Sequence, residues 1–96
     1  MDATDIDLGY WHLRLDGAVL ELLMADGASS RIHARHVTIE PPAPAVDQRQ
    51  APGGISVVLH SIRRGALWGQ FDVPAAQIPA VEALLAQVVA LGQSAG

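Results

Sequence analysis

Alternating apolar and polar positions predict β-strands in the first part of the chain. Residues 10–15 (YWHLRL) carry large apolar side chains at every second position, which is typical of a half-buried strand. Asp16-Gly17 follows directly and predicts a type I′ hairpin turn into the apolar run 18–24. Residues 25–28 (ADGA) indicate a second turn. We therefore expect an antiparallel hairpin that continues into a third strand.

That third strand, over residues 31–40, changes the parity of its apolar positions. Ile32 and Ala34 share one parity, whereas Val37 and Ile39 share the other. If both pairs face the core, the strand must contain a kink or bulge near residues 35–36. The side chains expected to face solvent are then Arg31, His33 and Arg35 before the kink, and His36, Thr38 and Glu40 after it.

A proline-rich segment interrupts the strand pattern. Residues 41–54 contain four prolines and two glycines, so we expect a long loop and no central strand. Strand character returns at residues 55–62, and Arg63-Arg64-Gly65 predicts a turn. A last strand is expected over residues 66–73, with Gly69 marking a bulge.

After Pro74 the apolar positions recur with the period of an α-helix. Pro79 suits the first turn, and Gly92 is the predicted stop of the helix. The apolar arc is wider than one small sheet needs, so part of it is a candidate surface for protein–protein contact. The interaction candidates on this helix are Val81, Leu84, Leu85, Val88, Val89 and Leu91.

Five or six antiparallel strands followed by one apolar helix predict an α+β fold, a curved sheet or partly open barrel capped by the C-terminal helix. The segments in question are YWHLRLDGAVLELL, RIHARHVTIE, GISVVLHSIRRGALWGQFDVP and AAQIPAVEALLAQVV, within residues 10–91. In this order they resemble the short bacterial pleckstrin-homology-like (PH-like) domains. The resemblance implies a binding or scaffold module without catalytic residues. It does not extend to phosphoinositide binding, because the first hairpin turn, Asp16-Gly17, lacks the Lys/Arg cluster of lipid-binding members.

Length and charge agree with one small domain. The chain has 96 residues, and 50% of them are hydrophobic. We expect a single folded domain over residues 10–92, which includes the proline-rich loop at residues 41–54. We expect a flexible acidic tail over residues 1–9, which holds three aspartates of a chain with net charge −4, and a flexible C-terminus over residues 93–96. A nearly neutral domain body argues against nucleic acid or anionic lipid as a partner. No membrane insertion and no signal peptide are expected, so the expected location is the cytoplasm.

The histidines raise the question of a metal site. A zinc site needs three or four ligands that converge on one point. His33 and His36 lie three residues apart and would point to opposite faces of a regular strand, unless the kink joins them. Cysteine is absent, and no H-E-x-x-H pattern occurs. We expect neither metal nor cofactor, and solvent-exposed strand positions for His12, His33, His36 and His60.

Three other patterns carry weak functional signals. A triad of Ser61, His60 and Asp72 has no nucleophile elbow around it. Residues 41–44 satisfy P-x-x-P, for which a rigid loop is the simpler interpretation than a polyproline ligand. A small basic stripe is interpreted as a solvated strand face, with contact to an acidic protein as the alternative. The stripe consists of Arg31, His33 and Arg35, with Arg14 as a further candidate member. The surface-polar candidates are Arg31, His33, Arg35 and His36.

These observations predict a non-enzymatic protein-interaction or scaffold module. It would self-associate or dock on a larger protein through its C-terminal helix or an open sheet edge. The alternative is a small ligand- or metal-binding protein, or an enzyme, that uses histidines on the sheet.

Overall fold

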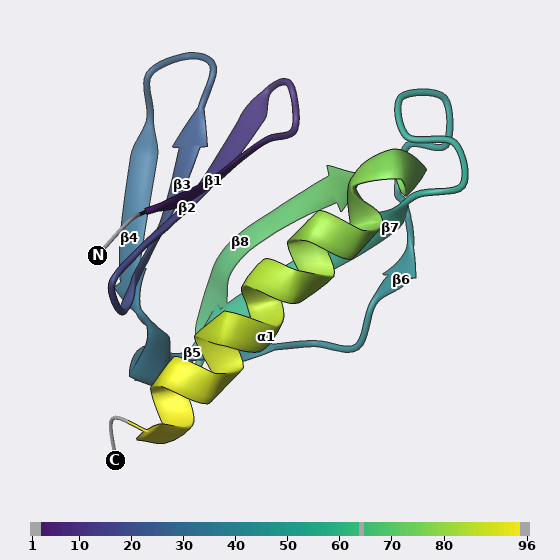
Figure 1. The fold of residues 1–96 in the computed structure, drawn as a ribbon. Helices are drawn as coiled ribbons and strands as arrows, with labels where there is room; N and C mark the ends of the chain where they lie inside the picture. Colours follow the sequence, from purple (N-terminus) through teal and green to yellow (C-terminus); the bar gives the residue numbers. More distant parts are fainter. Residues whose placement is uncertain (1–2, 64, 95–96) are drawn as a thin grey trace.

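The computed structural model describes residues 3–63 and 65–94, which form two antiparallel sheets and one C-terminal helix (Figure 1). The first sheet has the order β1-β2-β3-β4. In the second sheet, β7 pairs with β5 and β6 along one side and with β8 along the other. The strands are β1 (Thr4–Asp7), β2 (Trp11–Asp16), β3 (Val19–Met24), β4 (Ser29–His33), β5 (Val37–Ile39), β6 (Ala43–Pro44), β7 (Ile55–Ser61) and β8 (Ala66–Val73).

The α+β class is confirmed, but the described residues contain eight strands and not the five or six expected. Both sheets are open, so they do not form a closed barrel. The two additional strands are β1, in the expected tail, and β6, a two-residue strand inside the proline-rich loop. The turn expected at Arg63-Arg64-Gly65 includes Arg64, which lies outside the described residues.

Strand β1 (Thr4–Asp7) lies within the segment expected to be a flexible acidic tail, of which residues 1–2 are outside the described residues. It pairs antiparallel with β2 along its whole length, with Ile6 opposite Leu13. Both of these side chains are buried in the core, while Asp5 and Asp7 face solvent. The strand forms because one apolar residue between two acidic ones is enough to fix the register on a hydrophobic sheet face.

The first hairpin has a different turn from the one expected. Asp16 pairs with Val19, so the loop consists of Gly17 and Ala18. Gly17 has φ +60°, and no other type of residue in the described chain has a positive φ. Type I′ needs positive φ at both loop residues, whereas type II′ needs it only at the first. The geometry therefore fits type II′, with glycine at its first position.

The predicted kink is confirmed as a short 3-10 helix, η1 (Ala34–His36), between β4 and β5. It carries the chain from the first sheet to the second, and both ends are fastened by backbone hydrogen bonds. The Ala34 N–H donates to the Ala18 carbonyl at 2.8 Å, and the His36 carbonyl accepts from the Ile62 N–H at 2.8 Å. The change of parity in the sequence thus marks a crossing between sheets.

The bulge expected near Gly69 is also present. Gly69 pairs with Leu59 and Leu67 with His60, so β8 has one extra residue, Trp68, at this point. A Cβ atom on Gly69 would lie 3.0 Å from Leu22 Cδ2 of β3. Glycine therefore allows the bulged strand to approach the first sheet closely.

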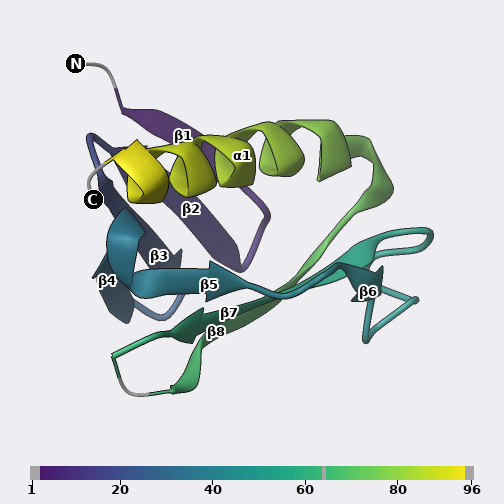
Figure 2. The ribbon, with the colours of Figure 1, turned by 90° about the horizontal axis from the view of Figure 1, so that it is seen from below.

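The C-terminal helix begins after η2 (Ala75–Gln77) as expected but continues past its predicted end. Helix α1 spans Ile78–Ser94, so Gly92 is an interior residue and the prediction of a stop there is wrong. A Cβ atom on Gly92 would lie 2.8 Å from the Ala34 carbonyl oxygen. Glycine is thus required by the contact between α1 and η1, visible at the C-terminal end of the helix (Figure 2).

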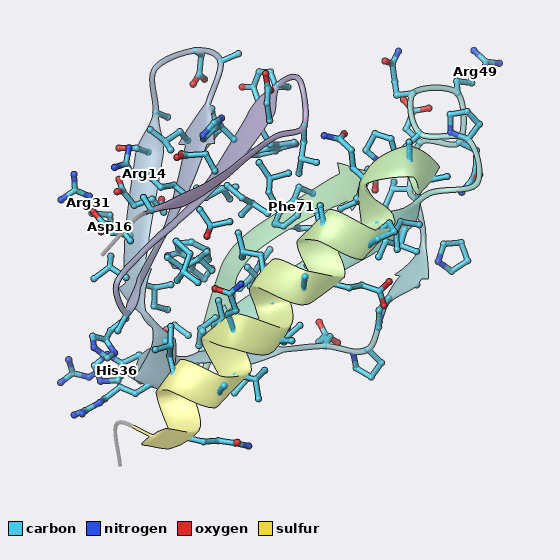
Figure 3. The ribbon with its side chains drawn as sticks, viewed as in Figure 1. Arg14, Asp16, Arg31, His36, Arg49 and Phe71 are labelled. Carbon is cyan, nitrogen blue, oxygen red and sulfur yellow. The ribbon has the colours of Figure 1, made fainter. Side chains whose placement is uncertain are left out.

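One hydrophobic core joins both sheets to α1. It contains leucines of β2 and β3, Val57 and Leu59 of β7, Phe71 of β8, and Val81, Leu84 and Val88 of the helix. Phe71 points into this space between the layers (Figure 3). By length and mean hydropathy (1.5), the segment Ala75–Gln93 also meets the criteria for a membrane-spanning helix. The core helix of a soluble protein can meet the same criteria, and Val81, Leu84 and Val88 of this segment are buried in the core, although only 17% of the segment is buried.

Candidate functional site

Two concave surfaces meet at η1 and contain most of the residues singled out by the sequence. The first, which we call the corner cleft, lies between β4, η1 and the β7–β8 turn and has a volume of about 780 Å³. Arg31, His33, His36 and Arg63 line it together with Trp68. Three of the four surface-polar candidates are therefore brought together, and Arg63 is an additional member that the sequence analysis assigned only to a turn.

The imidazoles of His33 and His36 lie close together because η1 turns between them. Their ring centroids are 5.8 Å apart. The Nδ1 atom of His33 accepts the backbone N–H of Arg35 at 3.2 Å. A ring nitrogen that accepts a hydrogen bond carries no proton, so the neutral His33 ring holds its proton on Nε2. His33 consequently offers an N–H donor on its other side.

Positive charge dominates the corner cleft. Partial burial lowers the pKa of His36 first, and electrostatic repulsion from Arg63, from His33 when it is protonated, and from Arg35 lowers it further. Among the described residues, no Asp or Glu side chain lines the cleft. On the adjacent strand β3, the Glu21 carboxylate accepts from Arg31 Nε at 3.0 Å.

Replacing Arg63 with glutamine is expected to raise the pKa of His36, because one of the charges that oppose protonation is removed. Burial remains, so the pKa should stay below the usual value for histidine. NMR titration of the imidazole protons measures both values. Arg49→Gln, far from His36 (Figure 3), is the matched control and should leave the titration unchanged. An unchanged His36 titration in the Arg63 variant would contradict this electrostatic account.

The same lowered pKa gives the sign of a pH effect on stability. The unfolded chain binds the His36 proton more readily than the folded chain does. The neutral His36 therefore costs the folded chain no stability above the pKa that His36 has in the unfolded chain. As the pH falls below that pKa, the free energy of unfolding decreases. The direction is opposite to that of a histidine whose charge is stabilised by a carboxylate.

The other two histidines lie elsewhere, each beside a carboxylate. His12 Nε2 is 2.8 Å from Asp5 Oδ1, and His60 Nε2 is 2.6 Å from Glu40 Oε2. No group of three His, Cys, Asp or Glu residues within the described ranges is placed to hold a metal ion. The four histidines therefore do not converge on one point in this part of the chain.

The triad considered from the sequence is not assembled. Asp72 lies opposite Ser56, four positions along β7 from His60. Its two carboxylate oxygens accept the N–H groups of Val46 (2.9 Å) and Asp47 (2.8 Å), so they fasten the proline-rich loop to β8. The role of Asp72 is thus to position a loop.

The second concave surface, which we call the β5–α1 groove, has a volume of about 340 Å³. It lies between the edge strand β5 and the C-terminal half of α1. Ile62 and Val89 line it and are 52% and 47% exposed, respectively. Together they place large apolar side chains in contact with solvent beside an open sheet edge.

The helix candidates divide according to which face of α1 they occupy. Val81, Leu84 and Val88 are almost completely buried in the core, and Val88 also lines the β5–α1 groove. Leu85 and Leu91 are partly buried against the same core. Val89 is exposed, and it is the candidate that the structure leaves most accessible. The wide apolar arc seen in the sequence serves mainly the core, because α1 lies against both sheets and η1.

The outward backbone groups of β5 are also accessible. The Ile62 N–H donates to the His36 carbonyl, and the Glu40 N–H donates to the Val58 carbonyl. In an antiparallel pair the peptide groups of every second residue point toward the partner strand, so His36, Thr38 and Glu40 are the residues whose peptide groups point toward β7. The peptide groups of Val37 and Ile39 therefore point away from β7. No further strand pairs with β5 in the described structure.

A third concave surface, of about 710 Å³, lies between the β1–β2 turn and the proline-rich loop. Tyr10, Trp11 and Phe71 line it. Its two acidic residues already accept backbone N–H groups of the loop: Asp72 as described above, and Asp47 from Arg49 at 3.0 Å. These carboxylates therefore hold the loop in place, and the aromatic side chains form the apolar part of this surface.

Comparisons with known proteins identify no related protein. The chain matches no protein-family model, and comparisons with curated proteins and with solved structures give no significant match.

Proposed function

We propose that this chain is a non-enzymatic protein-interaction module of PH-like type, which binds an extended segment of a partner protein in the β5–α1 groove. The partner segment would pair with the open edge of β5 and place apolar side chains against Ile62 and Val89. The observation that carries the proposal is the combination of outward peptide groups on β5 with exposed apolar side chains beside them.

Backbone geometry supports an extended occupant. An edge strand offers N–H and C=O groups at every second residue, and a second strand is the structure that matches this spacing. Val37 and Ile39 provide two such sets of groups. Pairing would give the partner main-chain hydrogen bonds, and the groove would recognise its side chains.

The size of the groove supports a short segment over a second copy of the chain. A stable interface between two folded proteins buries about 800 Å² on each partner. A groove of about 340 Å³ beside a three-residue strand suits a few residues of a peptide. The arrangement of antiparallel strands followed by a C-terminal helix supports the PH-like assignment, for which a binding role is expected.

Selection of peptides from a random library displayed on phage, with counter-selection on the Val89→Gln variant, tests the proposal. We expect the selected peptides to share alternating apolar positions and to perturb the NMR signals of β5. Their affinity should fall at least about tenfold in Val89→Gln, because a buried apolar contact would be replaced by a polar amide. Glutamine is a good helix former, so the fold should be retained.

Ala83→Gln is the matched control, since Ala83 is exposed on the same helix but does not line the groove. It should leave peptide affinity unchanged. The proposal would be overturned if no selected peptide distinguished the wild-type chain from Val89→Gln. It would also fail if sedimentation showed a dimer that Val89→Gln dissociates, because a second copy would then occupy the groove.

A further inference from the structure

The corner cleft has the charge of an anion-binding site. Its described lining includes the guanidinium group of Arg63 and the imidazoles of His33 and His36, and no Asp or Glu residue. Arg31 also lines the cleft, but its Nε donates to Glu21 on the neighbouring strand β3 at 3.0 Å. The chain as a whole carries a net charge of −4, so this positive cleft runs against the overall charge. A concave surface lined by one sign of charge concentrates ions of the opposite sign.

The donors around the cleft favour a phosphate-type oxyanion. Ser30 on β4 and Ser61 at the end of β7 add hydroxyl groups to the guanidinium group of Arg63. The Nε2–H of His33 is a further donor, because its Nδ1 already accepts the Arg35 N–H. A phosphate monoester has three acceptor oxygens and nearly two negative charges, so it can use donors from several elements at once.

The remaining wall of the cleft is apolar. Ile32, Leu67 and Trp68 line it, and Leu67 is more than half exposed to solvent. A large exposed aliphatic side chain beside a cationic cluster suits a ligand with both an anionic and an organic part.

We infer that the corner cleft binds a small-molecule phosphate monoester, with its phosphate held by Arg63 and His33 and its organic part against Leu67 and Trp68. The corner cleft is separate from the β5–α1 groove on which the proposed function rests, because neither Val89 nor the outward edge of β5 lines the cleft. Loss of peptide binding in Val89→Gln would therefore leave the inference untouched.

The imidazole of His36 provides the readout. The charged groups that act on it are His33 of β4, Arg35 of η1 and Arg63 of the β7–β8 turn. Titration of the full chain with inorganic phosphate, followed by NMR, should raise the pKa of His36, since a bound anion offsets these positive charges. Phenyl phosphate should do the same at lower concentration, by about three- to tenfold, because its ring contacts the apolar wall.

Three variants assign the binding to the cleft. Arg63→Gln should weaken phenyl phosphate binding about tenfold, as expected for the loss of a charge-assisted contact. Leu67→Gln should reduce the advantage of phenyl phosphate over inorganic phosphate. Arg49→Gln, in the proline-rich loop, should have no effect, because Arg49 lies at the opposite end of the molecule from His36 (Figure 3). Arg63, Leu67 and Arg49 are all exposed, and the thermal midpoint of each variant checks that it folds.

Specific outcomes would overturn the inference. An unchanged pKa of His36 at saturating phosphate would show that the anion does not enter the cleft. Equal weakening by Arg63→Gln and Arg49→Gln would show non-specific attraction to arginine. Binding to phosphatidylserine vesicles that depends on Arg63, without binding of either soluble phosphate, would assign the cleft to a membrane surface.

Discussion

Replacing Leu84 with alanine is expected to lower the free energy of unfolding by about 3 kcal/mol. Leu84 is 1% exposed and lies in the core between the helix and the sheets. Truncation removes buried apolar surface and leaves a cavity that neighbouring side chains fill only in part. For a chain of this size, the corresponding fall in the thermal midpoint is about 15 °C. Urea unfolding followed by circular dichroism measures the change.

Val89→Ala is the matched control for this experiment, because Val89 lies on the same helix but is 47% exposed. Its effect should stay within about 0.5 kcal/mol. Similar losses at the two positions would contradict the assignment of Leu84 to the core and Val89 to the surface.

Replacing Gly92 with alanine is expected to destabilise the chain by about 2 kcal/mol, although alanine is the better helix former. The added methyl group would lie 2.8 Å from the Ala34 carbonyl oxygen and 3.5 Å from Arg35 Cα. Both are backbone atoms, so the helix and η1 must separate to make room. Urea unfolding again gives the magnitude.

The control for Gly92→Ala is the reverse substitution at an exposed position of the same helix. Ala86→Gly should cost about 1 kcal/mol through helix propensity alone. Both substitutions should therefore destabilise the chain. Stabilisation by Gly92→Ala would show that propensity outweighs the contact with η1.

Local patterns were sufficient to predict most of the elements. The alternating run at residues 10–15 became β2, and the change of parity at residues 31–40 located η1. The helical period located α1, including its N-terminal boundary. These features depend on burial along one element, which a sequence records as periodicity.

Features that depend on contact between distant elements were missed or misread. Gly92 has the sequence context of a helix stop, and its close approach to Ala34 cannot be read from neighbouring residues. β1 was missed because a strand with one core residue has no visible period. The corner cleft forms because the β7–β8 turn lies beside β4, which brings Arg63 and His36 to the same surface. These residues are distant in the sequence, so their proximity could not be predicted from it.

The η1 segment is a shared wall between the two candidate binding surfaces. Ala34 and Arg35 line the β5–α1 groove, and His36 lines the corner cleft. Gly92 brings the last turns of α1 against this same wall. A ligand that displaces η1 from one side therefore alters the other side as well, and such coupling is reciprocal by thermodynamic necessity. If both proposed ligands bind, a three-residue connection between the sheets would thus make the two binding events dependent on each other.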